Sequence, residues 1–293
     1  MKKVVSLLLA ASVLFLLSSC GDSNQKPELQ PLRVGLVKGS AQVERDVFDN
    51  MTSRLELAGC ELTYVEYDTD EATLDALVKK EVDLTCCTTF ADFKAYDEAH
   101  PETLTNLGAA YYYPYGVFLC GFEKAEQITD GATIAVPSEA GGQARALMLL
   151  DAAGYITLKQ GKAFDATLDD IETNVRDFAI SAYPESELPN RYKNYSSDLV
   201  VMNSQTAVNA GYSVNKYSIA IESIDSLAAK EYAVVLLINS AEASSEQITS
   251  VKELFFSPLM YDLIDDTPKD LIVPAFEISP MKLAATTPEE ADK

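Results

Sequence analysis

The sequence predicts an α/β protein built on parallel β-sheets that are covered by helices. Short apolar runs typical of buried strands alternate with stretches of helical spacing. This alternation begins at residue 32 and starts again near residue 133. The length of 293 residues and the hydrophobic content of 47% suit two medium-sized domains, each with a packed core.

The first half of the chain predicts five elements in the order strand, helix, strand, helix, strand. The evidence is apolar spacing within each element, with Thr69 or Asp70 as the cap of the second helix. The predicted strands are 32–37, 61–67 and 82–87, and the predicted helices are 41–58 and 70–80. This order is typical of a parallel sheet with covering helices.

The second half repeats the alternation. A strand at 133–136 is stopped by Pro137, and a helix at 141–153 ends before Gly154, a C-terminal breaker. Further strands are predicted at 198–203 and 232–238, with a candidate at 175–181, followed by a helix at 244–264. The chain after Pro274 is expected to be irregular, and residues 281–293 are expected to be disordered.

The first 19 residues predict export. Lys2 and Lys3 precede an apolar run at 4–17, which is too short to cross a bilayer as a helix. The sequence Leu-Ser-Ser-Cys that ends at Cys20 resembles the lipobox of bacterial lipoproteins. This resemblance implies cleavage before Cys20 and lipidation of its thiol. The alternative is an ordinary secreted protein in which Cys20 is incidental.

Two or more acyl chains hold a protein firmly at a membrane, because each buried methylene contributes about 0.8 kcal/mol. The polar segment 21–31 then predicts a flexible stalk between the lipid and the fold. We therefore expect a protein anchored by lipid on the extracytoplasmic side of the cell membrane. The sequence leaves open whether this is a periplasm or a cell surface.

Charge and cysteine content exclude several classes of function. The formal net charge of −22 repels polyphosphates, which argues against nucleic-acid binding. The sequence has no CxxC pair and a single histidine, His100, so neither a metal site nor a cofactor is expected. Four cysteines remain beside Cys20, and both disulfides and buried free thiols are compatible with their positions: Cys60, Cys86, Cys87 and Cys120.

The strongest candidate site follows the strand that ends at Pro137. Gly141 and Gly142 allow close approach of a ligand, and the helix that follows carries Arg145 in its first turn. An arginine fork at a helix N-terminus suits a carboxylate. The alternative is a helix-face arginine paired with a nearby acid such as Glu139.

Segment 134–159 resembles the methionine-binding lipoproteins of the NlpA/MetQ family, the solute-binding components of ATP-driven importers. The matching residues are Pro137, Arg145, Ala146, Leu147, Leu149, Leu150, Gly154, Ile156 and Lys159. Two further segments match in order and spacing, 198–211 and the opening LRVGLVKGS at 32–40. The resemblance extends over roughly residues 32–265.

The resemblance implies a two-lobed fold, the type II periplasmic-binding-protein fold, with the ligand in a cleft between the lobes. Lobe one would hold residues 32–116 and 230–280, and lobe two residues 117–229. The two crossings would lie near 114–120 and 214–231. The implied partners are the membrane and ATPase subunits of an ABC importer.

The resemblance also implies roles for residues. Arg145 would hold the carboxylate of an amino-acid-like ligand, and Asn203 would bond its backbone, although a strand-end asparagine also suits a turn or helix cap. Cys87 and Thr89 replace the aromatic and histidine cage of the family, and Gly142 replaces an asparagine. Tyr113 and Tyr115 are candidates to refill the cage, with packing in the core and hinge as the alternative.

Two other functions compete with ligand capture. The sequence has no GxSxG, HExxH or P-loop motif, and Cys87 with His100 would be the only nucleophile–base pair, so we predict no enzyme. The other is a surface lipoprotein or adhesin that keeps the fold without a transport role. The expected cargo is methionine, a related amino acid or a short peptide.

Overall fold

The computed structural model describes residues 29–39, 41–267 and 271–277. Cys20, most of the predicted stalk and the predicted tail at 281–293 lie outside these ranges. No helix within the described ranges is both long and apolar enough to cross a membrane.

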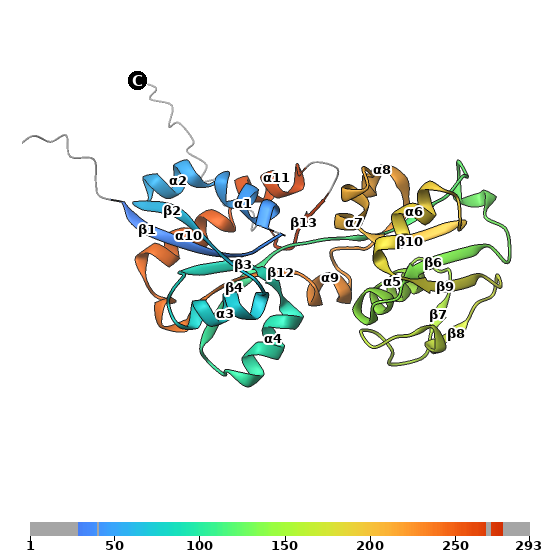
Figure 1. The fold of residues 1–293 in the computed structure, drawn as a ribbon, viewed down its shortest axis with the longest axis horizontal. Helices are drawn as coiled ribbons and strands as arrows, with labels where there is room; N and C mark the ends of the chain where they lie inside the picture. The colour runs from blue at the N-terminus through green and yellow to red at the C-terminus, as the bar shows by residue number, and fades with distance from the viewer. Residues whose placement is uncertain (1–28, 40, 268–270, 278–293) are drawn as a thin grey trace, which may run out of the picture.

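The protein has two α/β lobes side by side, each with a central sheet between layers of helices (Figure 1). The first sheet has six strands in the order β13-β4-β12-β3-β1-β2. Their bounds are β1 Gln30–Val37, β2 Cys60–Tyr67, β3 Leu84–Thr89, β4 Leu104–Tyr112, β12 Val234–Asn239 and β13 Val273–Pro274. β1 pairs in parallel with β2 and β3, as predicted, whereas β12 is antiparallel to both β3 and β4.

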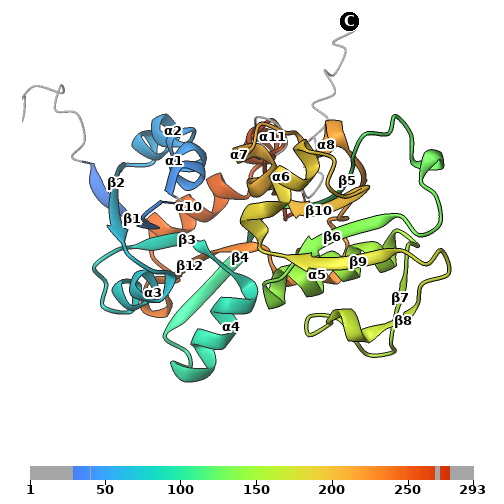
Figure 2. The ribbon, with the colours of Figure 1, turned by 45° about the vertical axis from the view of Figure 1, so that its right-hand side comes forward.

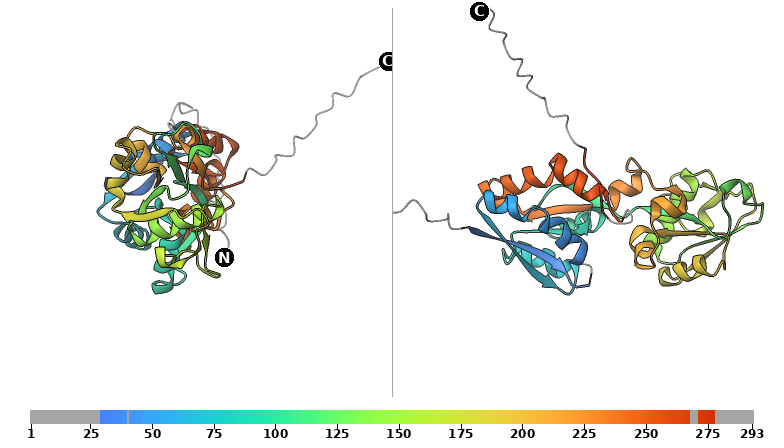
Figure 3. Two further views of the ribbon diagram at one scale, coloured as in Figure 1. Left: turned by 90° about the vertical axis from the view of Figure 1, so that its right-hand side faces the viewer. Right: turned by 90° about the horizontal axis from the view of Figure 1, so that it is seen from above.

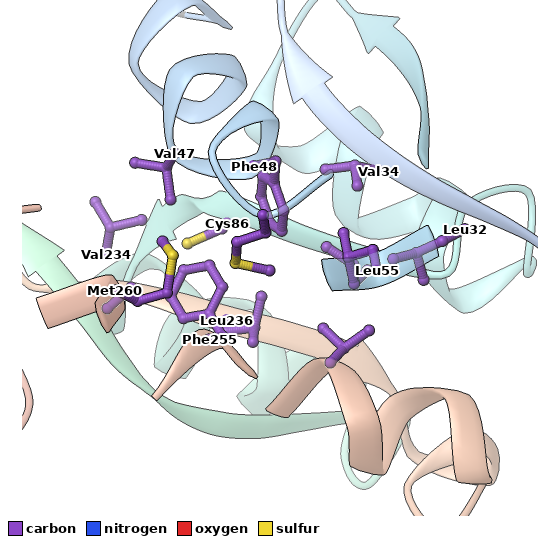
Figure 4. Close-up of a cluster of buried hydrophobic side chains, with 14 of the residues drawn as sticks. Leu32, Val34, Val47, Phe48, Leu55, Cys86, Val234, Leu236, Phe255 and Met260 are labelled. Atoms are coloured by element: carbon purple, nitrogen blue, oxygen red, sulfur yellow. The ribbon is translucent and has the colours of Figure 1, made fainter. Parts of the chain in front are cut away.

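Six helices cover the first sheet, and they divide between its two faces. They are α1 Ala41–Asp49, α2 Thr52–Leu57, α3 Asp70–Val78, α4 Phe90–Ala99, α10 Glu246–Phe255 and α11 Pro258–Asp265. The main core lies under α1, α2, α10 and α11, where Phe48 meets Phe255 at a centroid distance of 5.6 Å (Figure 4). A second cluster packs α3 and α4 on the other face.

Two helices that the spacing predicts as continuous are each broken. The predicted helix 41–58 becomes α1 and α2, since the Met51 N–H bonds the carbonyl of Phe48 in a tighter turn and the Met51 side chain is buried. The predicted helix 244–264 becomes α10 and α11, because Pro258 has no N–H to continue α10. Ser257 caps α11 instead.

The second sheet has five strands in the order β11-β5-β10-β6-β9. Their bounds are β5 Tyr115–Leu119, β6 Thr133–Pro137, β9 Ala179–Tyr183, β10 Leu199–Asn203 and β11 Ser218–Ile221. The candidate strand 175–181 begins later than predicted, because Asn174 closes a turn with both backbone polar groups of Phe178. A two-stranded ribbon of β7 Thr157–Leu158 and β8 Ile171–Thr173 lies at the side.

Helices cover both faces of the second sheet (Figure 2). α5 Ala140–Ala152 packs on one face, and α6 Leu188–Lys193, α7 Ser204–Asn209 and α8 Val214–Tyr217 pack on the other. Successive residues of β10 alternate between the two cores, with Val201 in one and Val200 in the other. Gly154, just after α5, has a φ of +76°, the conformation expected of a helix breaker.

Two segments cross between the lobes (Figure 3). The first is Tyr113 and Pro114, between β4 and β5, and the second runs from Glu222 to Ala233 with α9 Leu227–Glu231 inside it. The predicted crossings at 114–120 and 214–231 were too long. Residues 115–119 and 214–221 belong to the second lobe, because β10 and β11 both pair with β5.

The cysteines that the structure describes are all free thiols. Cys60, Cys86 and Cys120 are buried in the hydrophobic clusters. The sequence left open disulfides or buried free thiols, and the structure has buried free thiols at these three positions.

Candidate functional site

Arg145 lies at the centre of the candidate site. α5 begins at Ala140, so Arg145 is the sixth residue of the helix and lies in its second turn, one turn later than predicted. Its side chain is only 9% exposed. The guanidinium carbon lies 4.7 Å from the ring centroid of Tyr115 and 5.0 Å from that of Tyr232, so the cation sits against two aromatic rings.

The guanidinium is already paired with a buried acid. Nε donates to Oε1 of Glu222 at 2.9 Å, and Nη2 donates to Oε2 at 2.5 Å. Nη2 also donates to the carbonyl of Tyr113 at 2.9 Å. Arg145 therefore ties α5 to both crossing segments. The paired acid is Glu222 and not Glu139, whose carboxylate accepts the backbone N–H of Glu185.

This arrangement leaves one amino group of Arg145 available, Nη1, because Nη2 donates to both Glu222 and the Tyr113 carbonyl. Nη1 makes no hydrogen bond with any residue in the described ranges, while the Nε–Nη2 edge is held by Glu222. Glu222 is only 3% exposed, so the pair is desolvated. A pair of this kind fixes the plane of the guanidinium and directs its remaining amino group.

Asn203 follows β10 and caps α7. Its Oδ1 accepts the N–H of Thr206 at 2.7 Å, and its Nδ2 donates to Glu185, which also accepts the hydroxyl of Thr206. The helix-cap alternative therefore describes what Asn203 does in this structure. Asn203 is directly opposite Tyr115 in the pairing of β10 with β5, so it belongs to the same cluster as Arg145.

The two glycines differ in how closely they are packed. A Cβ on Gly142 would lie 3.0 Å from Cβ of Pro137 and 3.1 Å from the hydroxyl of Tyr115. A Cβ on Gly141 would have only the hydroxyl of Tyr232 near it, at 3.7 Å. Gly142 therefore lets α5 approach Tyr115 closely, whereas Gly141 has room for a methyl group.

Cys87 and Thr89 lie on β3 of the first lobe, apart from Arg145. Cys87 Sγ is 3.0 Å from the Thr85 hydroxyl, and burial raises the pKa of the thiol to about 12. The thiol is therefore protonated at neutral pH, which disfavours it as a nucleophile. Thr89 caps α4 by accepting the N–H of Asp92 at 3.2 Å.

Tyr113 connects the two groups of predicted site residues. Its carbonyl accepts a hydrogen bond from Arg145, while its ring meets that of Tyr111 edge-on at 5.9 Å. Its phenol, whose pKa is raised by burial first and then by the charges of Glu44 and Cys86, faces the first lobe. Arg145, Asn203, Gly142 and Tyr115 thus gather in the second lobe, and Tyr113 links them to Tyr111 on β4 of the first lobe.

The sequence prediction missed three residues of this region, Glu222, Tyr232 and Glu44. Glu222 is an acid that follows the apolar run SIAI, and Glu44 precedes Val47 and Phe48 by helical spacing on the apolar side of α1. An acidic residue within an otherwise apolar pattern was the signal in the sequence that could have identified both Glu222 and Glu44. Nothing in the sequence placed Tyr232 beside Arg145.

Comparison with known proteins agrees with this fold. The family model described as NlpA lipoprotein matches residues 32–276. The uncharacterized lipoprotein YhcJ of Bacillus subtilis is 25% identical over 270 residues, which are 92% of this chain and 93% of that protein. The methionine-binding lipoprotein MetQ of Bacillus subtilis is 27% identical over 175 residues, 59% of this chain and 63% of that protein.

A solved structure shares the two-lobed fold. It is that of a nutrient-binding protein from Burkholderia cenocepacia bound to methionine, which is 24% identical with a TM-score of 0.62. The match covers 84% of this chain and all of that one. Since the family model spans nearly all the described residues, the chain belongs to the NlpA lipoprotein family.

Proposed function

We propose that this protein is a membrane-anchored solute-binding lipoprotein that captures a small amino-acid-like ligand for an ABC importer. Membership of the NlpA family and the similarity to a methionine-binding lipoprotein support this role. The observation that carries it furthest is the buried Arg145, which is fixed by Glu222 and keeps Nη1 unpaired among the described residues.

The ligand carboxylate binds at the unpaired amino group of Arg145, Nη1. Glu222 neutralises most of the desolvation cost of the guanidinium before a ligand arrives, so the arginine is fixed in place in the empty protein. Nη1 then donates to the carboxylate in a charge-assisted bond. Asn203 adds an amide beside this contact, next to the hydroxyl of Tyr115 with which its side chain also forms a hydrogen bond.

The side chain of the ligand lies against the first lobe. Cys87, Thr89 and Tyr113 offer small polar groups and one ring in that region. The ligand is therefore methionine, a related amino acid or a short peptide. Closure of the lobes removes water from the site and strengthens each of these polar contacts.

The lipid on Cys20 holds the protein at the extracytoplasmic face of the membrane, in reach of the importer. The membrane and ATPase subunits of that importer are the partners. The described residues contain no group of three or more histidine, cysteine or acidic side chains that could hold a metal ion.

A surface lipoprotein or adhesin without a transport role is the second candidate. Its support is that Arg145 and Asn203 already have partners within the protein, Glu222 and Glu185. Under this alternative both residues have only structural roles, and the cleft binds no small molecule.

A thermal-shift screen separates the two candidates. The full-length protein in detergent is unfolded and refolded to release any bound ligand, and is then heated with L- and D-amino acids and methionine-containing dipeptides. A ligand at 100 times its dissociation constant stabilises the fold by about 2.7 kcal/mol, a shift of several degrees. Binding predicts such a shift for at least one compound, and no shift across the panel favours the adhesin.

A further inference from the structure

Two acidic side chains of the first lobe lack adequate partners. Glu44, in the first turn of α1, is only 4% exposed, and its Oε2 has no hydrogen-bond partner within the described residues. Its Oε1 accepts a long bond of 3.4 Å from the hydroxyl of Tyr111. The carboxylate of Asp70, the first residue of α3, is half-buried and forms no hydrogen bond or ion pair within the same ranges. Carboxylates are costly to bury without partners, so this arrangement needs an explanation.

The part of the chain that the structure describes supplies no cation to these two acids. The basic residues on either side of Glu44 in the sequence, Lys38 and Arg45, each form an ion pair with a different acid. Burial raises the pKa of Glu44 to about 7, and burial followed by the charge of Asp92 raises the pKa of Asp70. An acid in the first turn of a helix favours the helix dipole, but that does not require a buried oxygen without a partner. The missing partner is therefore a cation from outside the fold.

The two acids lie around the end of β3, beside the thiol of Cys87. Burial raises the pKa of this thiol first, and the charges of Asp70 and Glu44 raise it further. α1 and α3 follow the parallel strands β1 and β2, so their first turns lie at the carboxyl edge of the sheet, where open α/β sheets bind ligands. Cys87 belongs to the region that we propose for the side chain of the ligand. The two acids therefore flank that side chain.

Tyr113 sets how far these acids lie from the carboxylate site. Its carbonyl accepts a hydrogen bond from Arg145, and at its other end the charge of Glu44 adds to burial in raising the pKa of the phenol. A ligand held at Arg145 reaches the acids if its side chain is about as long as a tyrosine, as the side chains of lysine and arginine are. Space for such a side chain exists beside Asp70, which with Asp92 lines a cavity of about 400 Å³ between α3 and α4.

We propose that Glu44 and Asp70 bind a cation at the end of the ligand's side chain, so that the captured ligand is a basic amino acid. This inference rests on the proposed function, because Arg145 holds the carboxylate of the same ligand. One ammonium has three N–H groups and can donate to both carboxylates, which supplies the missing partner of each. Methionine is then a weaker ligand of the same site, because its thioether cannot donate a hydrogen bond.

The test compares L-lysine with L-norleucine, which has the same carbon skeleton and lacks only the terminal ammonium. Calorimetric titration of the refolded full-length protein at pH 8, where Glu44 is ionised, gives the dissociation constant of each probe. Hydrogen bonds between charged groups are stronger than those between neutral ones, so we expect lysine to bind about 10- to 100-fold more tightly than norleucine.

Glu44→Gln and Asp70→Asn supply the decisive comparison, because each keeps the shape of the side chain and removes its charge. We expect the preference for lysine to fall at least tenfold in each variant, with little change in the affinity for norleucine. The protein has a net charge of −22 and attracts any cation, so a control must remove a charge elsewhere. Glu98→Gln, at an exposed position of α4, does this and should keep the preference. Circular dichroism verifies that each variant is folded.

The outcomes separate this inference from the proposed function. If wild-type protein binds norleucine as tightly as lysine, or if both variants keep the preference for lysine, these acids do not bind a cation, although ligand capture stands. If the variants weaken both probes equally, the acids act only on the fold of the site, which also contradicts the inference. If wild-type protein binds neither probe, the inference is wrong, and the thermal-shift panel then decides whether ligand capture fails with it.

Discussion

At the scale of single residues, the Arg145–Glu222 pair means that a substitution of Arg145 affects the stability of the fold as well as ligand binding. From the sequence alone, Arg145→Ala is expected to abolish binding in a protein that stays folded. The structure adds a cost to folding to that expectation, because the variant leaves Glu222 buried without its cation. Removal of one partner of a buried pair costs about 3–5 kcal/mol.

We therefore predict that Arg145→Ala lowers the free energy of unfolding by about 3–5 kcal/mol, measured by urea denaturation. The double variant Arg145→Met, Glu222→Leu removes both charges and should recover most of this loss. A loss below about 1 kcal/mol in the single variant would contradict the buried pair.

Glu44 gives a prediction about pH. Burial raises its pKa to about 7 in the folded protein, whereas the unfolded carboxyl ionises near 4.5. Between these values the folded state holds a proton that the unfolded state has released, so stability falls as the pH rises through this window. Above pH 7 both states are ionised and the difference is constant.

The expected loss between pH 4.5 and 8 is about 3 kcal/mol, from the size of the pKa difference. Denaturation of wild-type protein and of Glu44→Gln at several pH values isolates this contribution. Asp70, Cys86, Cys87, Tyr111 and Tyr113 are common to both proteins, so their titration largely cancels. Parallel stability curves for the two proteins would show that Glu44 has an ordinary pKa.

Site residues that are close together in the sequence could be predicted from it, whereas those brought together by long-range packing could not. Gly142 and Arg145 are close in sequence, so strand, loop and helix signals locate them together. Glu222 is 77 positions from Arg145, and its pairing depends on how the two lobes are joined. Local spacing contains no information about that junction, which is why Glu139 appeared to be the natural partner.

At the scale of elements, the start of α5 decides how closely the helix approaches the hinge. Gly141→Ala should be tolerated and should stabilise the protein by up to about 1 kcal/mol, since the added methyl group has room and glycine is unfavourable in helices. Gly142→Ala should weaken ligand binding, because its methyl group displaces the hydroxyl of Tyr115 or Pro137.

Thermal unfolding and calorimetric titration of the two alanine variants test this pair. The variants change the same residue type at neighbouring positions of one helix, so each is the control for the other. Equal effects on affinity would mean that the contact of Gly142 with Tyr115 has no role in the site.

Element prediction succeeded where hydrophobic spacing was the dominant force. The buried strands β1, β6 and β10 and the helix α5 begin and end within two residues of the predicted positions. It failed where a backbone detail interrupts a continuous apolar face, at Met51 and at Pro258. Periodicity continues across both breaks, so only the local hydrogen bonds reveal them.

At the scale of the whole molecule, the two crossings set how the lobes move. Tyr113 and Pro114 form a short connection, and the second crossing contains α9. Arg145 joins both crossings through Tyr113 and Glu222. We predict that ligand binding closes the lobes about this junction and lowers the radius of gyration, which small-angle X-ray scattering measures. An unchanged scattering profile at saturation would contradict closure.

The division into two lobes was anticipated through the family resemblance, whereas the order of strands was not predicted. β12, from near residue 234, inserts between β3 and β4, which are adjacent in sequence. The apolar run of β12 identifies a buried strand but contains no sign of its neighbours. Topology of this kind follows from packing of the whole chain.

Calorimetric titration of the refolded full-length protein tests the central claim most directly. L-Methionine, D-methionine and glycyl-L-methionine are each titrated into wild-type protein and into Arg145→Lys, which retains a charge opposite Glu222 but lacks the second amino group that would bind the carboxylate. We predict saturable binding of at least one compound, with a dissociation constant on the order of micromolar and a loss of at least about tenfold in the variant. Absence of binding to wild-type protein, or equal affinity in the variant, would contradict ligand capture at Arg145.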